Sequence, residues 1–371
     1  MNLIRIREDL HRIPELGFEE KKTQAYILDL FRKENTLKVH LFEFPGILFE
    51  YHHGSGPYVL FRADMDALPL EEETNCAFSS IHPGLMHACG HDIHMTILIG
   101  LMKRVIEYNL NGNLLFLFQP AEEGRGGAER IIKTGILNNF KIKAAYALHV
   151  NGTLPLGWVA SKPGIFFANA HEVHVLFHGR SAHIAFPEQG RNALAAGVMF
   201  YSQFKQRLAL EFPAADEVAC EFGKMQAGTV MNAIAAECSL EGSIRTYQDK
   251  HMDFICRLIE VSAAQAAGSY DLQSEVIYKA YYRHVYNNHI LVEQLKQVVQ
   301  NNDINYRETE RVFTGEDFGF FTHLYPGLLF WLGTDTGEKQ DLHSSRFLPS
   351  DAAIDIGLEV FWRLFQAEEK T

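Results

Sequence analysis

Several carboxylate, cysteine and histidine side chains follow apolar, strand-like runs of this sequence. Asp64 and Asp66 lie near the end of the run at 58–67, and residues two apart point to the same side of a strand. Two carboxylates on one side repel each other unless a cation or a shared proton relieves the charge. The pair therefore indicates either a cation site or an ordinary solvated strand end.

The densest cluster is the stretch 86–94, which reads Met-His-Ala-Cys-Gly-His-Asp-Ile-His. Cys89 and His91 flank a glycine that permits a tight turn, and thiolate and imidazole are common zinc ligands. For Cys89 alone, a buried and inert thiol is the alternative. We expect Asp92 either to cap the following helix or to orient His91. A packed or solvated histidine is the more ordinary interpretation of His94.

Two adjacent acids, Glu122 and Glu123, end the apolar run at 114–123. Adjacent residues point in different directions, so one carboxylate can face a metal while its neighbour faces a bound water. A hydrolase that activates water needs both roles, a Lewis-acid metal and a general base. The alternative is an acidic surface turn before the glycine-rich stretch that follows.

Two further histidines complete the set of candidate ligands. His149 lies in the apolar run at 144–150, where a lone histidine is more often structural. His343 lies in a polar loop, and the acidic loop 314–319 precedes it. One cysteine, three histidines and several carboxylates suffice for one or two ions of zinc, manganese or cobalt. Their long separations favour a catalytic centre assembled by the fold over a structural site.

The elements that must position these residues form two patterns. Up to 167, apolar runs alternate with helices, as expected for strands buried on both faces of an α/β sheet. From 168 to 282 the order is strand, helix, strand, strand, helix, strand, which is typical of a ferredoxin-like α+β sandwich. We therefore predict an α/β catalytic domain, 1–167 and 283–371, interrupted by an inserted domain, 168–282. Ligands of such sheets bind at the carboxyl ends of the strands.

Composition restricts the classes of function. The length of 371 residues suits two or three domains at roughly 150 residues each. The 34 basic and 46 acidic residues give a net charge of −12, which disfavours nucleic acids and anionic membranes as partners. We find neither a membrane-spanning run nor a signal peptide. Five cysteines without a CxxC motif indicate a reducing compartment, and we expect a cytoplasmic protein.

Together these motifs resemble one known family. The sequence is similar to the amidohydrolase branch of the aminoacylase/carboxypeptidase metallopeptidases, which includes hippurate hydrolases, auxin-conjugate hydrolases and N-acetyldiaminopimelate deacetylases. The resemblance lies in DLHRIPELGFEE, RADMDALP, MHACGHDIHM, LFQPAEEGRGGAE, ALHV, GRSAHIAFP, GSIRT, TGEDFGFF and LHSSRF, from residue 9 to about residue 347. HRIPELGF and the segments around PAEEG and TGEDFG are most similar to the deacetylases. This implies N-acetyl-diaminopimelate as the substrate, with hippurate-type or broad N-acyl amino acid hydrolysis as the alternative.

The resemblance implies roles for residues of the predicted catalytic domain. It implies two divalent metal ions, zinc, manganese or cobalt, bound by Cys89, His91, Glu123, His149 and His343. Glu122 resembles the general base that takes a proton from the attacking water. Asp64 or Asp66 corresponds to the active-site aspartate, and the sequence leaves open which of the two it is.

The resemblance also implies roles for the inserted domain. His183 resembles a residue that stabilises the tetrahedral intermediate, in some relatives from a partner subunit. Asn232 and Arg245 resemble residues that hold the carboxylate of the substrate. The inserted domain is expected to act as a lid and to form a homodimer, and the expected partner is a small N-acyl amino acid.

Two other classes of function stay open on the residues alone. A non-catalytic protein on the same scaffold would bind metal or an amino acid without hydrolysis. A thiol enzyme using Cys89 would need a thiolate of lowered pKa. The complete cysteine, histidine and glutamate set favours the hydrolase, because a protein that has lost activity can also lose ligands.

Overall fold

The chain forms two compact units in a computed structural model that describes residues 2–213, 217–337 and 340–368. The first unit comprises Met1–Phe166, Val285–Arg311 and Asp317–Thr371, and the second comprises Phe167–His284 and Val312–Glu316. The segment Val312–Glu316 was not part of the insertion expected from the sequence. It joins the second unit because the N–H of Ala168 donates to the carbonyls of Val312 and Thr314.

An eight-stranded mixed sheet forms the centre of the first unit, in the order β1-β2-β4-β3-β5-β14-β6-β13. The strands are β1 (Leu37–Leu41), β2 (Ile47–His53), β3 (Tyr58–Asp64), β4 (Gly112–Gln119), β5 (Ile142–Pro155), β6 (Trp158–Ser161), β13 (Asn305–Glu308) and β14 (Gly327–Asp335). The four neighbours β4, β3, β5 and β14 run parallel. Every residue of β4 is buried, as expected for a strand covered on both faces. The carboxyl ends of these four strands therefore lie at one edge of the sheet.

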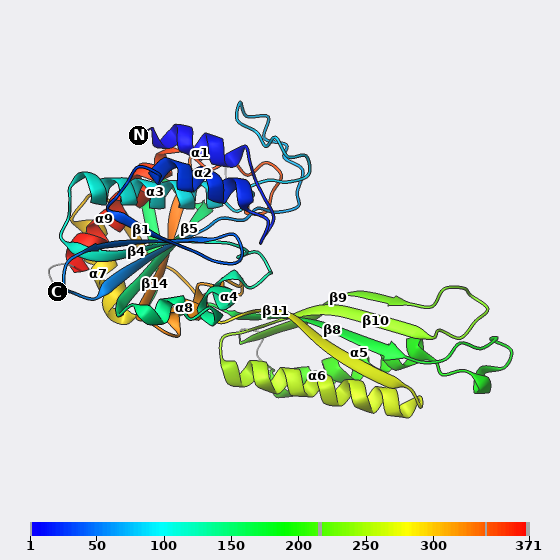
Figure 1. Ribbon diagram of the computed structural model, residues 1–371. Coiled ribbons are helices and arrows are strands. Elements are labelled where there is room, and N and C mark those ends of the chain that lie inside the picture. The colour runs from blue at the N-terminus through cyan, green and yellow to red at the C-terminus, as the bar shows by residue number, and fades with distance from the viewer. Residues whose placement is uncertain (1, 214–216, 338–339, 369–371) are drawn as a thin grey trace. The chain divides into compact units, whose positions relative to one another are not determined.

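Helices cover both faces of this sheet (Figure 1). They are α1 (Leu3–His11), α2 (Lys21–Phe31), α3 (His91–Glu107), α4 (Gly127–Lys133), α7 (His289–Gln300), α8 (Gly319–Thr322) and α9 (Ala352–Glu368), with the short helix η1 (Ile136–Asn139) and a two-stranded pair, β7 (Gly164–Phe167) and β12 (Val285–Asn287). Helix α3 contacts α1 and α9 on one face, and α4 contacts α8 on the other. The first twelve residues of α3 are all buried, so its start is fixed within the core.

The second unit has a four-stranded antiparallel sheet in the order β11-β8-β10-β9. Its elements along the chain are β8 (Asn169–His178), η2 (Pro187–Gln189), α5 (Ala193–Glu211), β9 (Val218–Ala227), β10 (Glu237–Thr246), α6 (Asp249–Ser269) and β11 (Gln273–Tyr282). Side chains of α5, α6 and the sheet share one core that includes Phe177, Phe200 and Ile259. This core is separate from that of the first unit.

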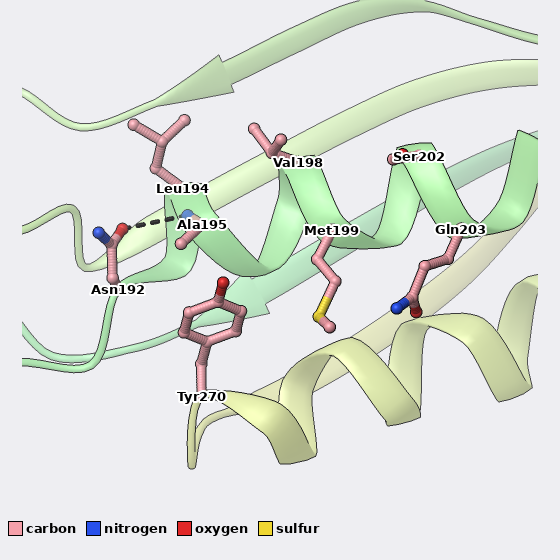
Figure 2. A pocket seen from close by; sticks show the side chains of 8 residues that line it. All are labelled: Asn192, Leu194, Ala195, Val198, Met199, Ser202, Gln203 and Tyr270. Carbon is pink, nitrogen blue, oxygen red and sulfur yellow. Dashed lines mark hydrogen bonds between the residues drawn. The ribbon is translucent and has the colours of Figure 1, made fainter.

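One face of α5 is apolar and exposed. Leu194 and Val198, four residues apart on the helix, have 44% and 53% of their surface exposed. They line a pocket that Tyr270, at the end of α6, completes (Figure 2). Within the described ranges, no helix combines the length and the apolar character needed to cross a membrane.

Candidate functional site

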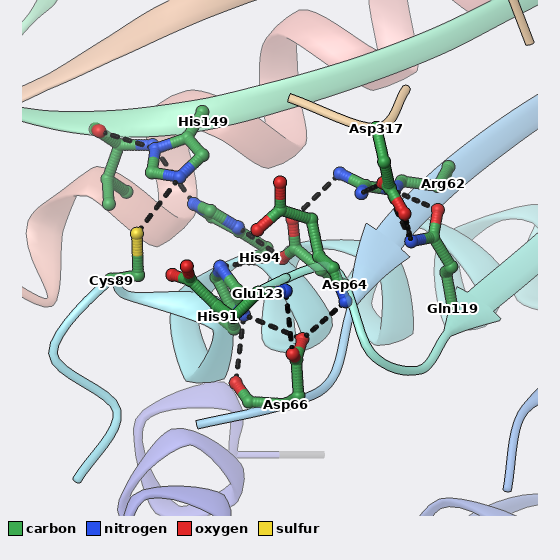
Figure 3. A network of polar contacts seen from close by, with 12 residues as sticks. Arg62, Asp64, Asp66, Cys89, His91, His94, Gln119, Glu123, His149 and Asp317 are labelled. Carbon is green, nitrogen blue, oxygen red and sulfur yellow. Dashed lines mark hydrogen bonds and ion pairs between the residues drawn. The ribbon is translucent and has the colours of Figure 1, made fainter. Parts of the chain in front are cut away.

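The turn Cys89-Gly90-His91 leads directly into α3. Gly90 has a φ of +80°, and a Cβ there would lie 2.4 Å from Cγ2 of Val150, so only glycine fits. The Sγ of Cys89 lies 3.3 Å from Nε2 of His149 and 3.4 Å from Nε2 of His343. The tight turn expected from the sequence thus lies where β5 and the late polar loop bring two histidines (Figure 3 shows Cys89 and His149).

Backbone carbonyls orient two of the histidines. His91 Nδ1 lies 2.8 Å from the carbonyl oxygen of Asp66, and His149 Nδ1 lies 2.8 Å from that of Val150. A carbonyl can only accept, so each Nδ1 carries a proton and each Nε2 is the ring nitrogen left to bind a metal. Hydrogen bonds of this kind are typical of metal-binding histidines. Among the residues that the structure describes, none forms a hydrogen bond with the buried Nε2 of His91, as expected of an atom that binds an ion.

Asp66 holds the acidic turn that follows β4. Its carboxylate accepts hydrogen bonds from the backbone N–H groups of Glu122 at 3.1 Å and Glu123 at 2.9 Å. Ala121, just before them, has a φ of +57°, a left-handed conformation that is unfavourable for alanine. Such strain persists only where surrounding contacts enforce it, and Asp66 supplies two of these contacts.

The carboxylates of Glu122 and Glu123 face different parts of the cluster, as their adjacent positions in the sequence suggested. Glu123 Oε1 lies 3.2 Å from Nε2 of His343. Glu122 is buried, and one of its carboxylate oxygens lies within 4.8 Å of ligand atoms of both His91 and Glu123. The interpretation as an acidic surface turn is therefore wrong for Glu122.

Asp64 belongs to a buried ionic network rather than to a solvated strand end (Figure 3). Its carboxylate accepts hydrogen bonds from Arg62 at 2.7 Å and from Nδ1 of His94 at 2.6 Å. Arg62 also donates to Gln119 at 2.9 Å and to Asp317 at 2.8 Å. Asp64 Oδ1 lies 3.8 Å from Nε2 of His91. Asp64 and Asp317 thus share the single positive charge of Arg62 within the network.

The network contains residues whose roles the sequence did not reveal. Arg62, Gln119 and Asp317 are fully buried together, and Asp317 also accepts a hydrogen bond from the N–H of Ala128. The only signal in the sequence was the acidic loop around Asp317. Nothing in the sequence connects that loop to an arginine 255 positions earlier.

Asp92 does neither of the two things expected of it. It makes no side-chain capping hydrogen bond at the start of α3, where Gly90 is the capping residue. Its Oδ2 instead accepts hydrogen bonds from Nε of Arg7 and from Nδ1 of His11, both at 2.8 Å. The partners that α1 brings satisfy this oxygen, so His91 is oriented by a backbone carbonyl and not by its neighbour.

Burial and nearby charges set the protonation of the histidines in the metal-free protein. Burial, reinforced by His94, lowers the pKa of His149 to about 3, so its imidazole is neutral. Burial also acts to lower the pKa of His91, but Asp64 and Asp66 outweigh it and raise the value to about 10. In the metal-free protein His91 is therefore protonated, and a metal cation would replace the proton on its Nε2.

The acidic groups respond to the same surroundings. Burial raises the pKa of the Cys89 thiol well above its ordinary value, and the charges of Glu123 and Glu122 raise it further. Burial opposes ionisation of Glu123, but His343 and His91 lower its pKa overall. Without a cation the thiol is thus protonated and a poor nucleophile, which disfavours the thiol-enzyme interpretation.

The donor set fits one or two divalent metal ions. Three overlapping groups each bring their ligand atoms within 4.8 Å of one another: Cys89, His91 and His149; Cys89, Glu123 and His343; and His91, Glu122 and Glu123. Mixed sulfur, nitrogen and oxygen ligands suit zinc, and the carboxylates also admit manganese or cobalt. The structure therefore assembles all five residues that the resemblance implied as ligands.

The second unit brings together two of its three expected residues. His183 is exposed and pairs with Ala233, while the N–H of Ile184 donates to the carbonyl of Asn232 at 3.0 Å. Arg245 lies at the other end of β10 from this pair. From Glu237 to Arg245, at about 3.3 Å per residue, the strand spans roughly 26 Å. Within one chain, Arg245 therefore lies far from Asn232, and one small carboxylate can meet both side chains only if they come from different chains.

Comparison with known proteins assigns the chain to a family. Residues 60–367 match the model of peptidase family M20/M25/M40. The chain belongs to this family. The family resemblance inferred from the motifs is confirmed by this match and by curated relatives that align over nearly the whole chain.

Two relatives are named N-acetyldiaminopimelate deacetylase. The Oceanobacillus iheyensis protein is 39% identical over 361 residues, which cover 96% of this chain and 97% of the relative. The Shouchella clausii protein is 39% identical over 360 residues, covering 96% of each.

A solved structure from Bacillus subtilis, described as a dinuclear metal-binding peptidase of family M20, is 28% identical. It covers 100% of this chain and 98% of its own, with a TM-score of 0.83.

Proposed function

We propose that the protein is a metal-dependent amide hydrolase that removes the acetyl group from N-acetyl-diaminopimelate, producing diaminopimelate and acetate. The observation that carries the hydrolase assignment is the buried cluster in which Cys89 Sγ contacts two histidine Nε2 atoms beside Glu122. The names of the relatives at 39% identity support the substrate. All five cysteines are free, which supports a reducing, cytoplasmic compartment.

Five side chains would hold the two metal ions: Cys89, His91, Glu123, His149 and His343. When bound, the ions supply Lewis-acid polarisation of the acyl carbonyl and make water acidic near neutral pH. Zinc, manganese and cobalt are all compatible with these ligands. The chain itself keeps the histidine Nε2 atoms directed at the ions through the carbonyls of Asp66 and Val150.

Glu122 acts as the general base and then as the general acid. Its carboxylate takes a proton from the water that attacks the acyl carbon. The carbon–nitrogen bond then breaks, and Glu122 delivers the proton to the departing amine nitrogen. Burial of Glu122 within reach of the metal-ligand atoms supports this role, because a general base must lie beside the water it activates.

Asp66 and Asp64 are positioning residues in this proposal. Asp66 fixes the turn that presents Glu122 and Glu123, through two backbone hydrogen bonds. Asp64 keeps His94 and Arg62 in place next to His91. Of the two, Asp66 is the better candidate for the active-site aspartate, because it orients both glutamates directly.

The second unit would act as a ferredoxin-like lid and dimerisation domain, inserted at about 167 and 284. Arg245 would pair with the substrate carboxylate, and His183 would stabilise the oxyanion. His183 pairs with Ala233, just before the start of β10, whereas Arg245 lies near the end of this strand, which spans roughly 26 Å from Glu237 to Arg245. Both can therefore reach one small substrate only if they come from different chains. The exposed apolar face around Leu194 and Val198 supports a homodimer (Figure 2).

Amine release from a substrate panel tests the function. Protein loaded with manganese or zinc would be offered N-acetyl-diaminopimelate, hippurate and several N-acetyl amino acids, with metal-loaded Glu122→Gln as the control. Preference for N-acetyl-diaminopimelate is the expected result. Preference for hippurate would retain the chemistry and replace the substrate. Release from none of them by protein with confirmed metal content would favour a non-catalytic binding protein.

A further inference from the structure

A second cluster of metal-binding side-chain types lies outside the candidate centre, where the loop 69–84 meets the end of α1. His11 is the last residue of α1, and Glu72 and Cys76 lie on the loop. His11 Nε2 is 3.3 Å from Glu72 Oε1, and Cys76 Sγ is 3.8 Å from the same oxygen. All three ligand atoms lie within 4.8 Å of one another. The proposed hydrolysis uses none of these three residues.

These spacings match those around one tetrahedral ion. Zinc binds nitrogen and oxygen at about 2.0–2.1 Å and sulfur at about 2.3 Å. Tetrahedral angles then place a nitrogen and an oxygen ligand about 3.3 Å apart, and a sulfur and an oxygen ligand about 3.6 Å apart. The distances of 3.3 Å and 3.8 Å found here are close to these values.

Hydrogen bonds outside the cluster orient two of the three residues. His11 Nδ1 bonds to Oδ2 of Asp92 at 2.8 Å, which directs Nε2 at Glu72. Arg7 binds the same oxygen of Asp92 and balances its charge. The N–H of Ser80 donates to Glu72 Oε2 at 2.7 Å, which leaves Oε1 on the side of the cluster. A carboxylate behind the imidazole and a hydrogen-bonded carboxylate are characteristic of metal-binding residues.

Access to the cluster comes from the side of Cys76. The side chains of His11 and Glu72 are 0% and 5% exposed, whereas Cys76 is half-buried. The hydroxyl of Thr74 also donates to Glu72 Oε1, and Ser79 Oγ lies 3.5 Å from the Cys76 sulfur. A hydroxyl or a water can therefore complete the coordination.

We propose that His11, Glu72 and Cys76 form a separate binding site for a zinc-class divalent cation. Binding releases the thiol proton of Cys76 to solvent, and any proton on Nε2 of His11 leaves with it. The thiolate and imidazole select zinc, cobalt or cadmium over magnesium or calcium.

An ion here would brace two segments that carry candidate ligands. Asp92, which holds His11, directly follows His91 in the chain. On the loop, Glu73 forms two hydrogen bonds with Ser345. The N–H of Glu73 donates to the carbonyl of Ser345 at 2.8 Å, and the carboxylate of Glu73 accepts from the Ser345 hydroxyl at 2.8 Å. Ser345 lies two residues after His343. The site would thus stiffen the supports of the candidate centre without touching its ions.

Cobalt spectroscopy isolates the Cys76 sulfur. In a Cys89→Ser variant, the thiol of the candidate centre is gone, so a thiolate-to-cobalt charge-transfer band must come from another cysteine. We expect the band in Cys89→Ser and in Cys89→Ser with Cys256→Ser, and its loss in Cys89→Ser with Cys76→Ser. Cys256 is a matched control because it is also free and half-buried. Absence of the band in folded Cys89→Ser would overturn the proposal.

Zinc content gives a second measurement that leaves Cys89 intact. After equilibration with zinc and removal of loosely bound ions, Cys76→Ser is expected to hold about one zinc fewer per chain than the wild type. Cys256→Ser should hold as much as the wild type. Equal content in Cys76→Ser and the wild type would refute the site. Neither readout uses turnover, so the outcome is independent of the proposed deacetylation.

Discussion

The two units of this protein differ in whether their candidate functional residues are buried or exposed. In the first unit, Cys89, His91 and Glu122 are buried, and each lies close to other candidate ligands. In the second, His183 and Asn232 are exposed on paired loop segments. Buried polar groups need partners that fix their geometry, whereas exposed ones are solvated and acquire their role on binding. The first unit thus forms a complete candidate centre within one chain. The exposed residues of the second unit acquire a role only when a substrate or a partner chain binds them.

The largest expected effect comes from replacing the buried His91, and the exposed His183 serves as the comparison. His91→Ala should lose metal and reduce activity by about 10⁴-fold or more, because Lewis-acid polarisation and water activation are lost together. Metal content and the rate of amine release are measured on the same samples. His183→Ala is the control and should keep its metal. Full metal content in His91→Ala would remove His91 from the ligand set.

Glu122→Gln separates chemistry from metal binding inside the first unit. The amide keeps the size of the side chain but cannot accept the proton, so turnover should fall by about 10²–10⁴-fold with metal content unchanged. Glu129→Gln, a partly exposed acid at the start of α4, serves as the comparison and should behave as the wild type. Near-normal rates in metal-loaded Glu122→Gln would show that another group is the base.

His183→Ala tests whether the second unit serves a partner chain. We expect a fall in turnover of about 10²-fold, from the lost oxyanion contact, with little change in stability because the side chain is exposed.

Mixing the two inactive variants sharpens this test. In a mixed dimer of His183→Ala and Glu122→Gln, one of the two sites would combine an intact Glu122 with an intact His183 from the other chain. Refolding them together at equal amounts should restore about a quarter of wild-type activity. Activity no higher than the sum of the separate variants would place His183 outside a shared site.

The smallest expected effect concerns Glu20, the acid that contacts the turn before Glu122 and Glu123. Glu20 is buried and its Oε1 accepts the N–H of Ala121 at 2.8 Å. Burial, with the charge of Asp66, raises the pKa of Glu20 to about 8. A raised pKa in the folded state means that its contribution to stability is complete below about pH 4.5 and is lost as the pH rises towards about 8.

Glu20→Gln should therefore flatten the pH dependence of unfolding. In the metal-free protein, Glu20 should lower the free energy of unfolding as the pH rises from about 5 to about 8, and the variant should lack this contribution. Urea unfolding at both pH values measures it, with the exposed Glu19→Gln as the control. Identical slopes in wild type and Glu20→Gln would show that Glu20 ionises normally.

Sequence patterns predicted the elements with long periodic or continuous apolar runs. The apolar run at 58–67 contains β3 (Tyr58–Asp64), and the run at 114–123 overlaps β4 (Gly112–Gln119). The strands β1 and β13 were missed because each is short and mostly exposed, so neither shows a buried run. The role of Asp92 was wrong for a different reason: its partners Arg7 and His11 come from a helix more than eighty positions away.

Local chemistry was determined by the sequence itself. The glycine between Cys89 and His91, the adjacent Glu122 and Glu123, and the family motifs follow from residue types and short spacings. The tertiary structure decided which charges neutralise each other, because the network of Arg62 and Asp317 joins segments 255 positions apart. It also decided that Arg245 lies near the end of β10, whereas His183 pairs with Ala233, just before the start of that strand. Spacing along a chain sets local geometry, whereas distances between remote residues arise only when the core packs.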